Sequence, residues 1–261
     1  MTLQQHSRIE LPAAVARFSF CVRTDVGTVR TINQDSVLTR TPVFLVADGM
    51  GGHARGDAAS QTVLRVFQEH IARDCASTPE RILDAIHSAN DAVRELSAPD
   101  DFGAAVSGTT LAGIAFVDSG DGFHWMAFNV GDSRVYTWTD GVLTQLSVDH
   151  SAVQELVDAG LITPADAVNH PERDVITRAL GANEFVDADV WLLPASGEQS
   201  FLICSDGLTK ELPDSDIARV LADGIRWNEA GPCVADALVE EALKRGGHDN
   251  VSVVFVQSTL S

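Results

Sequence analysis

Short apolar runs recur along the chain, and their pattern is typical of β-strands. Several alternate apolar and polar positions, as a strand with one buried face does, and others are continuous apolar runs with turn residues at both ends. We predict strands at residues 17–25, 41–48, 109–118, 122–132, 133–141, 199–207 and 250–257. The turn sequences DSGDG and TDG, which lie between 118 and 141, predict antiparallel hairpins there.

Four other segments have the periodicity of amphipathic helices. They are residues 57–74, 79–97, 214–223 and 232–245. The second begins with Pro79 and places five apolar side chains on one stripe, and the last ends at two glycines, which stop helices. Strands and helices do not alternate regularly, so we predict one domain of the α+β class, in which mostly antiparallel sheet is flanked by helices.

The composition is that of a globular protein that does not cross a membrane. The chain has 261 residues, of which 45% are hydrophobic. No run approaches the roughly 18 consecutive apolar residues of a membrane span, and the first residues do not form a secretion signal. The four cysteines are scattered without a C-x-x-C pair, so we expect unpaired thiols in a reducing compartment, the cytoplasm.

The charge of the chain argues against one class of partner. Acidic residues outnumber basic ones by 37 to 18, and the formal net charge is −19. Affinity for a nucleic-acid backbone depends on lysine and arginine, so such a surface would repel it. The excess acids are expected to serve solubility, with some of them neutralising bound cations.

Aspartates stand at the ends of several predicted strands. Asp48 follows VFLVA, Asp132 follows MAFNVG, Asp206 follows FLICS and Asp249 precedes NVSVVFV, while Asp35 lies within RTINQDS. A single aspartate in such a place is usually a turn former or a cap. Four of them in the same relation to buried strands predict a cluster, and a cluster needs cations because like charges repel.

The available ligands indicate which cation would suit the cluster. Carboxylate and carbonyl oxygens without histidine or cysteine at zinc spacing favour magnesium or manganese. Two such ions about 3.5–4 Å apart can share a carboxylate and clamp a phosphoryl oxygen. Asp48 is well placed to bridge them, and the Gly49 carbonyl could reach a metal. Arg30 is a candidate phosphate clamp, although an arginine in isolation is more often a solvated surface residue.

One motif suggests a different function and is rejected. Residues 49–54, GMGGHA, fit the dinucleotide-binding pattern G-x-G-x-x-A, and Glu69 lies 20 residues after Gly49. However, Asp48 would place a negative charge beside the pyrophosphate. Glu69 also lies inside a predicted helix, whereas the acid should end a second strand.

Eight motifs, in order along nearly the whole chain, resemble those of the metal-dependent protein phosphatases. They are RTINQDS (30–36), VADGMGGH (46–53), SGTTL (107–111), VGDSRVY (130–136), SVDHS (147–151), ITRALG (176–181), CSDGL (204–208) and GGHDNVSVV (246–254). The resemblance is to the PPM, or type-2C, serine/threonine family in its bacterial single-domain form. It implies one catalytic domain over 1–261, a four-layer α-β-β-α sandwich of two antiparallel sheets with a flap near 149–175.

The resemblance also implies roles for individual residues. Asp48 would bridge two Mn²⁺ or Mg²⁺ ions, Asp206 and Asp249 would complete the first site, and the Gly49 carbonyl with waters would hold the second. Asp35 would bind one of those waters, and Arg30 would bind the substrate phosphate. Asp132 would hold a third metal that it shares with Asp206, and Asp174 of the flap would approach that ion.

The implied reaction is direct hydrolysis, in which a metal-bridging water attacks phosphorus and no phosphoenzyme forms. One position departs from the family. Eukaryotic members have a histidine, a proposed general acid, where this chain has Met50. His53 or a metal-bound water could take that role, and the sequence leaves the proton donor open. We expect His150 and His170 in the flap to be surface or packing residues.

These observations predict a cytoplasmic, monomeric phosphatase that acts on phosphoserine and phosphothreonine in proteins. Its partners would be a cognate serine/threonine kinase and the substrates of that kinase, with neither nucleic acid nor direct membrane insertion. A catalytically inactive relative that binds phosphoproteins is an alternative, but Asp35, Asp48, Asp206 and Asp249 are all retained. A hydrolase of small phosphate esters that uses the same centre stays open.

Overall fold

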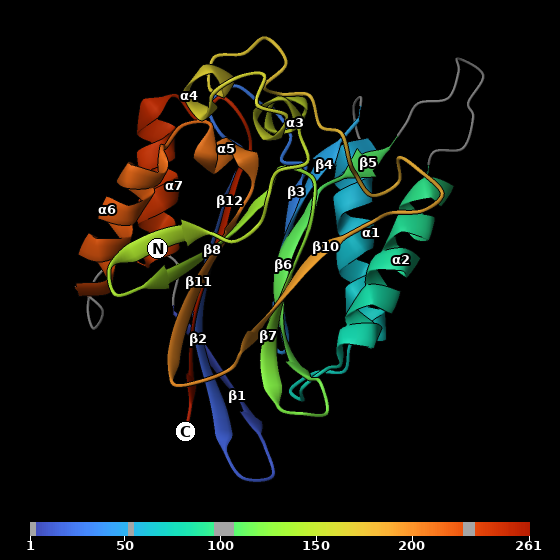
Figure 1. Cartoon of the computed structure of the whole chain (residues 1–261), viewed down its shortest axis with the longest axis vertical. Coiled ribbons are helices and arrows are strands. Elements are labelled where there is room, and N and C mark those ends of the chain that lie inside the picture. The colour runs from blue at the N-terminus through green and yellow to red at the C-terminus, as the bar shows by residue number, and fades with distance from the viewer. Residues whose placement is uncertain (1–3, 52–54, 97–106, 227–232) are drawn as a thin grey trace.

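Two antiparallel sheets face each other in the computed structural model, which describes residues 4–51, 55–96, 107–226 and 233–261 (Figure 1). The first sheet has the order β1-β2-β12-β11-β8-β9. Its strands are β1 (Gln5–Glu10), β2 (Val15–Asp25), β8 (Arg134–Thr139), β9 (Val142–Gln145), β11 (Glu198–Cys204) and β12 (Val251–Leu260). The second sheet has the order β10-β7-β6-β4-β3, and β5 pairs with β4. Its strands are β3 (Asp35–Arg40), β4 (Val43–Met50), β5 (Gly108–Thr109), β6 (Leu111–Asp118), β7 (Phe123–Val130) and β10 (Asp189–Pro194).

Helices cover the outer face of each sheet (Figure 1). Helices α1 (Arg55–His70) and α2 (Pro79–Glu95) pack on the second sheet, and α6 (Asp214–Arg226) and α7 (Val234–Arg245) pack on the first. Three short helices, α3 (Ala152–Asp158), α4 (Pro164–Ala167) and α5 (Asp206–Thr209), lie at one end of the sandwich. Among the helices described, none combines the length and the apolar character that a membrane crossing needs. The predicted α+β, four-layer α-β-β-α sandwich is confirmed.

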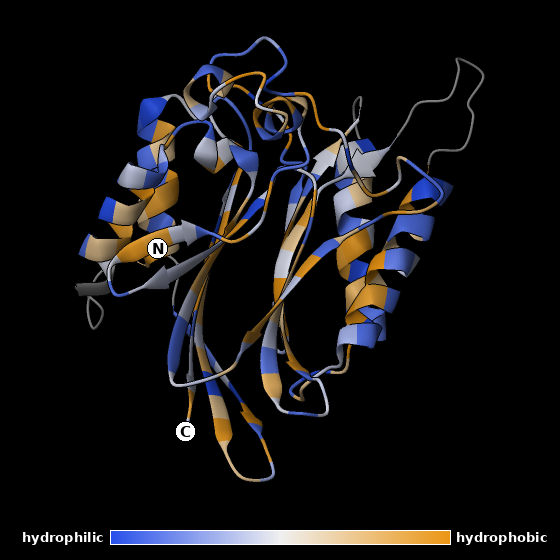
Figure 2. Cartoon of the chain, in the orientation of Figure 1, coloured by the Kyte–Doolittle hydropathy of each residue, from blue (hydrophilic) through white to orange (hydrophobic). Residues whose placement is uncertain are grey.

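Three apolar layers hold the sandwich together. One lies between the sheets, and the other two lie between each sheet and its pair of helices, whose apolar faces point inward (Figure 2). The central layer is rich in aromatic rings, and Phe18 meets Trp125 edge-on with ring centroids 5.7 Å apart. Trp125 also donates a hydrogen bond from its indole nitrogen to the Ser258 hydroxyl at 3.2 Å, so its one polar atom is satisfied. The rigid double sheet fixes the positions of the loops at its ends.

The predicted strands and helices are all present, with ends shifted by a few residues, but the periodicity missed the elements with weak apolar character. Strands β1, β3, β9 and β10 were not predicted. β1 has one buried side chain, Ile9, and β9 has none, because both are edge strands. Helices α3 and α4 of the flap also bury no residue, so no apolar stripe marks them in the sequence.

The expectation of four unpaired cysteines is wrong for two of them. Cys21 of β2 and Cys233, at the start of α7, form a disulfide across a separation of 212 residues. Helix α7 packs directly on β2, so the fold brings together two cysteines whose spacing gave no hint of pairing. Cys204 is a free thiol buried in the same layer, and Cys75 is a free thiol on the surface.

Candidate active site

All five predicted carboxylates lie at one end of the sandwich, where the strands of the two sheets end. Asp35 begins β3 and faces Asp48 directly across the β3–β4 pair. Asp206 begins α5 immediately after β11, and Asp249 lies two residues before β12. Asp132 lies in the connection between β7 and β8, which passes from one sheet to the other. The site therefore takes side chains from both sheets.

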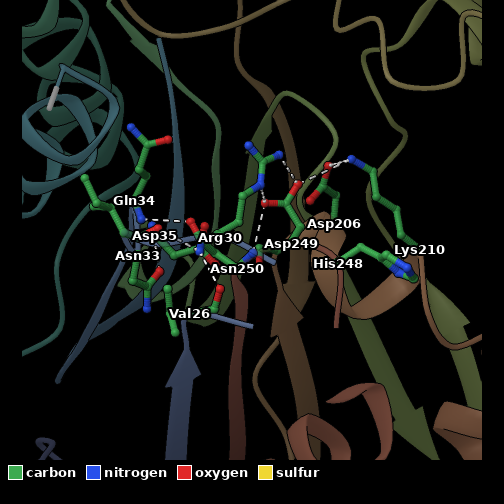
Figure 3. A network of polar contacts seen from close by, with 12 residues as sticks. Val26, Arg30, Asn33, Gln34, Asp35, Asp206, Lys210, His248, Asp249 and Asn250 are labelled. Carbon is green, nitrogen blue, oxygen red and sulfur yellow. Dashed lines mark hydrogen bonds and ion pairs between the residues drawn. The ribbon is translucent and has the colours of Figure 1, made fainter. Parts of the chain in front are cut away.

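Asn250 fixes the segment that carries Arg30 to the segment that carries Asp249 (Figure 3). Its side-chain amide donates to the carbonyls of Val26 and Ile32, both at 3.0 Å, and its amide oxygen accepts from the backbone N–H of Gln34 at 2.8 Å. A side chain at position 207 would collide with the Asn250 carbonyl, so the glycine of the CSDGL motif allows α5 to approach β12 closely. These contacts place Asp206 and Asp249 on the same wall.

Hydroxyl groups hold the two aspartates of the second sheet. The backbone N–H of Asp48 donates to the Thr110 hydroxyl at 3.0 Å. Ser205 donates from its hydroxyl to Asp35 at 2.8 Å and accepts from the backbone N–H of Ser252 at 2.9 Å. Ser205 belongs to the first sheet, so this chain of hydrogen bonds joins the two halves of the site.

The loop that carries Asp132 is held by His150. Gly131 donates its backbone N–H to the His150 Nδ1 at 3.0 Å, and the His150 backbone N–H donates to the Gly131 carbonyl at 2.9 Å. The His150 Nε2 faces Asp189 at 3.3 Å. Gly131 has a φ of 105°, which favours glycine, and a side chain there would collide with Thr110. His150 was expected to be a surface or packing residue; it is buried, and its contacts position Asp132.

Two cations pair with the carboxylates of the first sheet (Figure 3). Arg30 makes a bidentate contact with Asp249, in which Nε and Nη2 each lie 2.9 Å from a carboxylate oxygen. Lys210 lies one helical turn after Asp206, and its Nζ is 2.6 Å from the Asp206 Oδ2, 3.1 Å from the Asp174 Oδ1 and 4.0 Å from the Asp249 Oδ2. Arg30 and Asp174 therefore reach the site, as predicted.

The site carries an excess of negative charge in a poorly hydrated place. Burial raises the pKa of Asp35 to about 6, although hydrogen bonds from Ser252 and Ser205 oppose this. Burial, followed by the Asp206 charge, raises the pKa of Asp132 to about 7. The pKa of Asp48 lies well above its usual range because of burial and the four neighbouring aspartates. Such shifts mean that the ionised cluster is unstable without further positive charge.

The donor atoms fit divalent cations that prefer oxygen. In the described part of the chain, one buried oxygen each of Asp35, Asp132 and Asp206 has no hydrogen-bond partner. Carboxylate and carbonyl oxygens are the ligands of Mg²⁺ and Mn²⁺. No three acidic, histidine or cysteine side chains of the described residues stand close enough to hold one ion as they are. Arg30 pairs with both oxygens of Asp249, and Lys210 pairs with one oxygen of Asp206, so cation binding would require these contacts to rearrange.

A cavity of about 500 Å³ opens over the carboxylates. Arg30, Asp48, Met50, Asp206 and Asp249 line it, and the flap contributes residues from one side. A second groove of about 610 Å³ runs between the flap and α5 and shares Asp206 and Lys210 with the first. His53, one of the candidate proton donors, lies outside the described residues.

Four residues that build the site were not predicted from the sequence. They are Lys210, Asn250, Ser205 and Thr110, and each contacts a predicted site residue. Lys210 follows Asp206 by four residues, and the spacing of one helical turn would have indicated the contact if α5 had been predicted. The other three are adjacent to, or inside, motifs that the analysis had quoted.

Comparison with known proteins gives one consistent result. The protein phosphatase 2C family model matches residues 28–244. The chain is 34% identical over 247 residues to the serine/threonine phosphatase stp of Listeria innocua, a match covering 91% of this chain and 95% of that protein. Its structure is similar to the PPM Ser-Thr phosphatase MsPP of Mycobacterium smegmatis in complex with cacodylate, with a TM-score of 0.79, 35% identity and coverage of 91% and 97%. It is also similar to the catalytic domain of PstP in complex with 2 manganese ions, with a TM-score of 0.78, 33% identity and coverage of 94% and 99%.

Proposed function

The chain belongs to the protein phosphatase 2C family and is a metal-dependent protein serine/threonine phosphatase, and from this premise we propose how its own residues serve the reaction. The observation that carries the proposal is the set of five aspartates, drawn from both sheets, at one end of the sandwich, where Asp48, Asp206 and Asp249 line one cavity. When bound, the divalent cations supply Lewis-acid chemistry, since they lower the pKa of water and neutralise phosphoryl oxygens.

We assign a role to each of the proposed metal ligands. Asp48 would contact both ions of the core site, Asp206 and Asp249 would complete the first, and the Gly49 carbonyl would serve the second. Asp35 would hold a water, and its buried free oxygen is available for this. Asp132, together with Asp206 and Asp174, would serve a third cation. The all-oxygen donor set admits Mn²⁺ or Mg²⁺.

Arg30 would bind the phosphoryl group of the substrate. Its guanidinium lines the cavity and is half-exposed, and its present partner is Asp249. Planar donors of this kind match two phosphoryl oxygens. None of the described side chains that line the cavity is a serine, threonine or cysteine. The aspartates that line the cavity are the proposed cation ligands, and we propose direct attack of water on phosphorus, without a covalent phosphoenzyme, as the family resemblance implies.

The groove beside the cavity favours protein substrates over small phosphate esters. It is continuous with the cavity through Asp174, Asp206 and Lys210, and the flap lines it with apolar side chains such as Val153, Val157 and Val168. Residues that flank a phosphoserine or phosphothreonine would have a surface to lie on. We assign residues 149–175 to the flap of a single catalytic domain that spans 1–261.

The biological setting is a further part of the proposal. We expect the phosphatase to oppose a cognate serine/threonine kinase in the cytoplasm and to act as a monomer. The acidic surface, with a net charge of −19, fits phosphoproteins that carry basic residues near the phosphorylated site, as many kinase substrates would.

The experiment is release of phosphate from a phosphothreonine peptide, measured with Mn²⁺ and then with EDTA. Turnover should require the metal. Asp48→Ala and Asp206→Ala should each abolish turnover, whereas Asp187→Ala, which changes an exposed aspartate away from the cavity, should not. Wild-type rates in the Asp206 variant would refute the metal assignment. Faster hydrolysis of nucleotides than of phosphopeptides would refute the substrate class.

A further inference from the structure

Lys210 places a fixed positive charge between three carboxylates from three different segments. Its ammonium lies against Asp206 of α5, Asp174 of the flap and, more distantly, Asp249 before β12. Helix α5 sets this position, because the Lys210 backbone N–H donates to the Asp206 carbonyl at 2.8 Å and the two side chains emerge one turn apart. The lysine is part of the carboxylate cluster itself (Figure 3).

The choice of lysine at this position is notable because the chain uses arginine almost everywhere else. Only Lys210 and Lys244 are lysines among the 18 lysine and arginine residues. An ammonium is a compact point charge with three donors, whereas a guanidinium is a planar fork. In size and charge distribution the ammonium is the side-chain group that most resembles a small inorganic cation.

Lys210 contacts two of the three carboxylates that are proposed to hold the third cation. That site would use Asp132, Asp206 and Asp174, and Lys210 contacts the last two. Asp132 and Asp206 are each more than nine-tenths buried, and each keeps one oxygen without a partner in the described part of the chain. A divalent ion that used these oxygens would lie beside the ammonium, and two cations at such short range repel each other strongly.

We propose that Lys210 is a tethered cation that competes with a divalent ion for the flap side of the cluster. In the metal-free protein it neutralises Asp206 and Asp174 and holds the flap against α5. A third divalent ion binds only when the Lys210 side chain withdraws, so Lys210 weakens that site and leaves the Asp48 side of the cluster to the other two ions. This inference rests on the proposed metal centre and adds to it a residue that controls how many ions bind.

The test is to count bound Mn²⁺ by equilibrium dialysis and calorimetry in the wild type and in Lys210→Met. The matched control is Lys244→Met, which removes the other lysine, an exposed side chain paired with Glu241 on α7. Wild type and control should bind two ions tightly and a third weakly. Lys210→Met should bind the third ion at least about tenfold more tightly, because the competing charge is gone. Lys210→Gln, which keeps a hydrogen-bond donor without the charge, should do the same.

A second measurement separates competition from an ordinary structural role. The melting temperature of Lys210→Met should fall below that of the wild type in EDTA, and this gap should close when Mn²⁺ saturates the protein. An equal gap with and without Mn²⁺ would overturn the proposal, as would unchanged third-ion affinity in both neutral variants. Failure of the wild type to bind any Mn²⁺ would instead refute the metal centre on which the proposed function depends.

Discussion

Replacing Asp132 by asparagine should stabilise the metal-free protein at alkaline pH, although it removes a proposed metal ligand. Burial and the neighbouring Asp206 raise the pKa of the Asp132 carboxyl to about 7 in the folded chain, against a value of 3.8 for an exposed aspartate. Between these two pH values the folded chain holds a proton that the unfolded chain has lost. The free energy of unfolding therefore decreases as the pH rises through this window.

The magnitude follows from the size of the shift. A difference of about 3 pKa units corresponds to about 4 kcal/mol, since one unit is worth about 1.4 kcal/mol. Asparagine does not ionise, so Asp132→Asn should gain about 4 kcal/mol relative to the wild type between about pH 4 and pH 8. Above the folded pKa the gain should be constant, and below about pH 4 it should vanish. The Asp132 charge also helps to raise the pKa of Asp48, so the loss of this charge should lower that pKa and add to the gain.

The assay is urea denaturation in EDTA, followed by tryptophan fluorescence, at several pH values across this range. Asp187→Asn, which changes an exposed aspartate outside the cluster, is the control. Its free energy of unfolding should change with pH in the same way as that of the wild type. A difference between Asp132→Asn and the wild type that does not change with pH would refute the reasoning. It would mean that the Asp132 carboxyl is hydrated or otherwise neutralised in the folded chain.

Three other predictions follow from the contacts around the site. Arg30→Ala should raise KM for a phosphothreonine peptide more than it lowers kcat. Arg65→Ala, on the exposed face of α1, should change neither constant. An effect of Arg30→Ala on kcat alone would contradict the phosphate-binding role. Gly49→Ala should lower the free energy of unfolding by about 1–3 kcal/mol in urea, because its Cβ would collide with the Gly56 carbonyl; unchanged stability would show that the end of β4 can shift. Cys233→Ser should cost about 2–4 kcal/mol, and reduction of the wild type should cost the same; a midpoint insensitive to reductant would contradict the Cys21–Cys233 disulfide.

The sequence predicted the strands of the two sheets well because most of them bury apolar side chains. It missed the edge strands β1 and β9, which bury little, and the helices of the flap, which bury nothing. These elements are held by backbone pairing and end capping, such as the Thr163–Asp166 capping box of α4, and not by an apolar stripe. The periodicity of apolar residues therefore cannot predict these elements.

The acidic residues of the site could be predicted from the sequence, but the long-range contacts around them could not. Aspartates at strand ends, together with the motif order, correctly pointed to side chains that the structure brings together. The spacing could not show that Cys21 meets Cys233, that Lys210 reaches Asp174, or that Asn250 binds three backbone groups of the segment that carries Arg30. Each of these is a long-range contact that depends on how the two sheets pack together, and local sequence patterns do not predict that packing.

The position of β12 between β2 and β11 has a consequence for the order in which a ribosome makes the protein. The first sheet lacks a central strand until residues 251–260 have emerged, and Asp249 emerges only just before them. A nascent chain thus carries Arg30, Asp35 and Asp48 before it carries Asp249, the carboxylate that pairs with Arg30. Because Asp249 is a proposed metal ligand, we expect chains that end before it to be inactive. The open edge of β2 during the same interval is a surface that a ribosome-associated chaperone would need to shield from pairing with other chains.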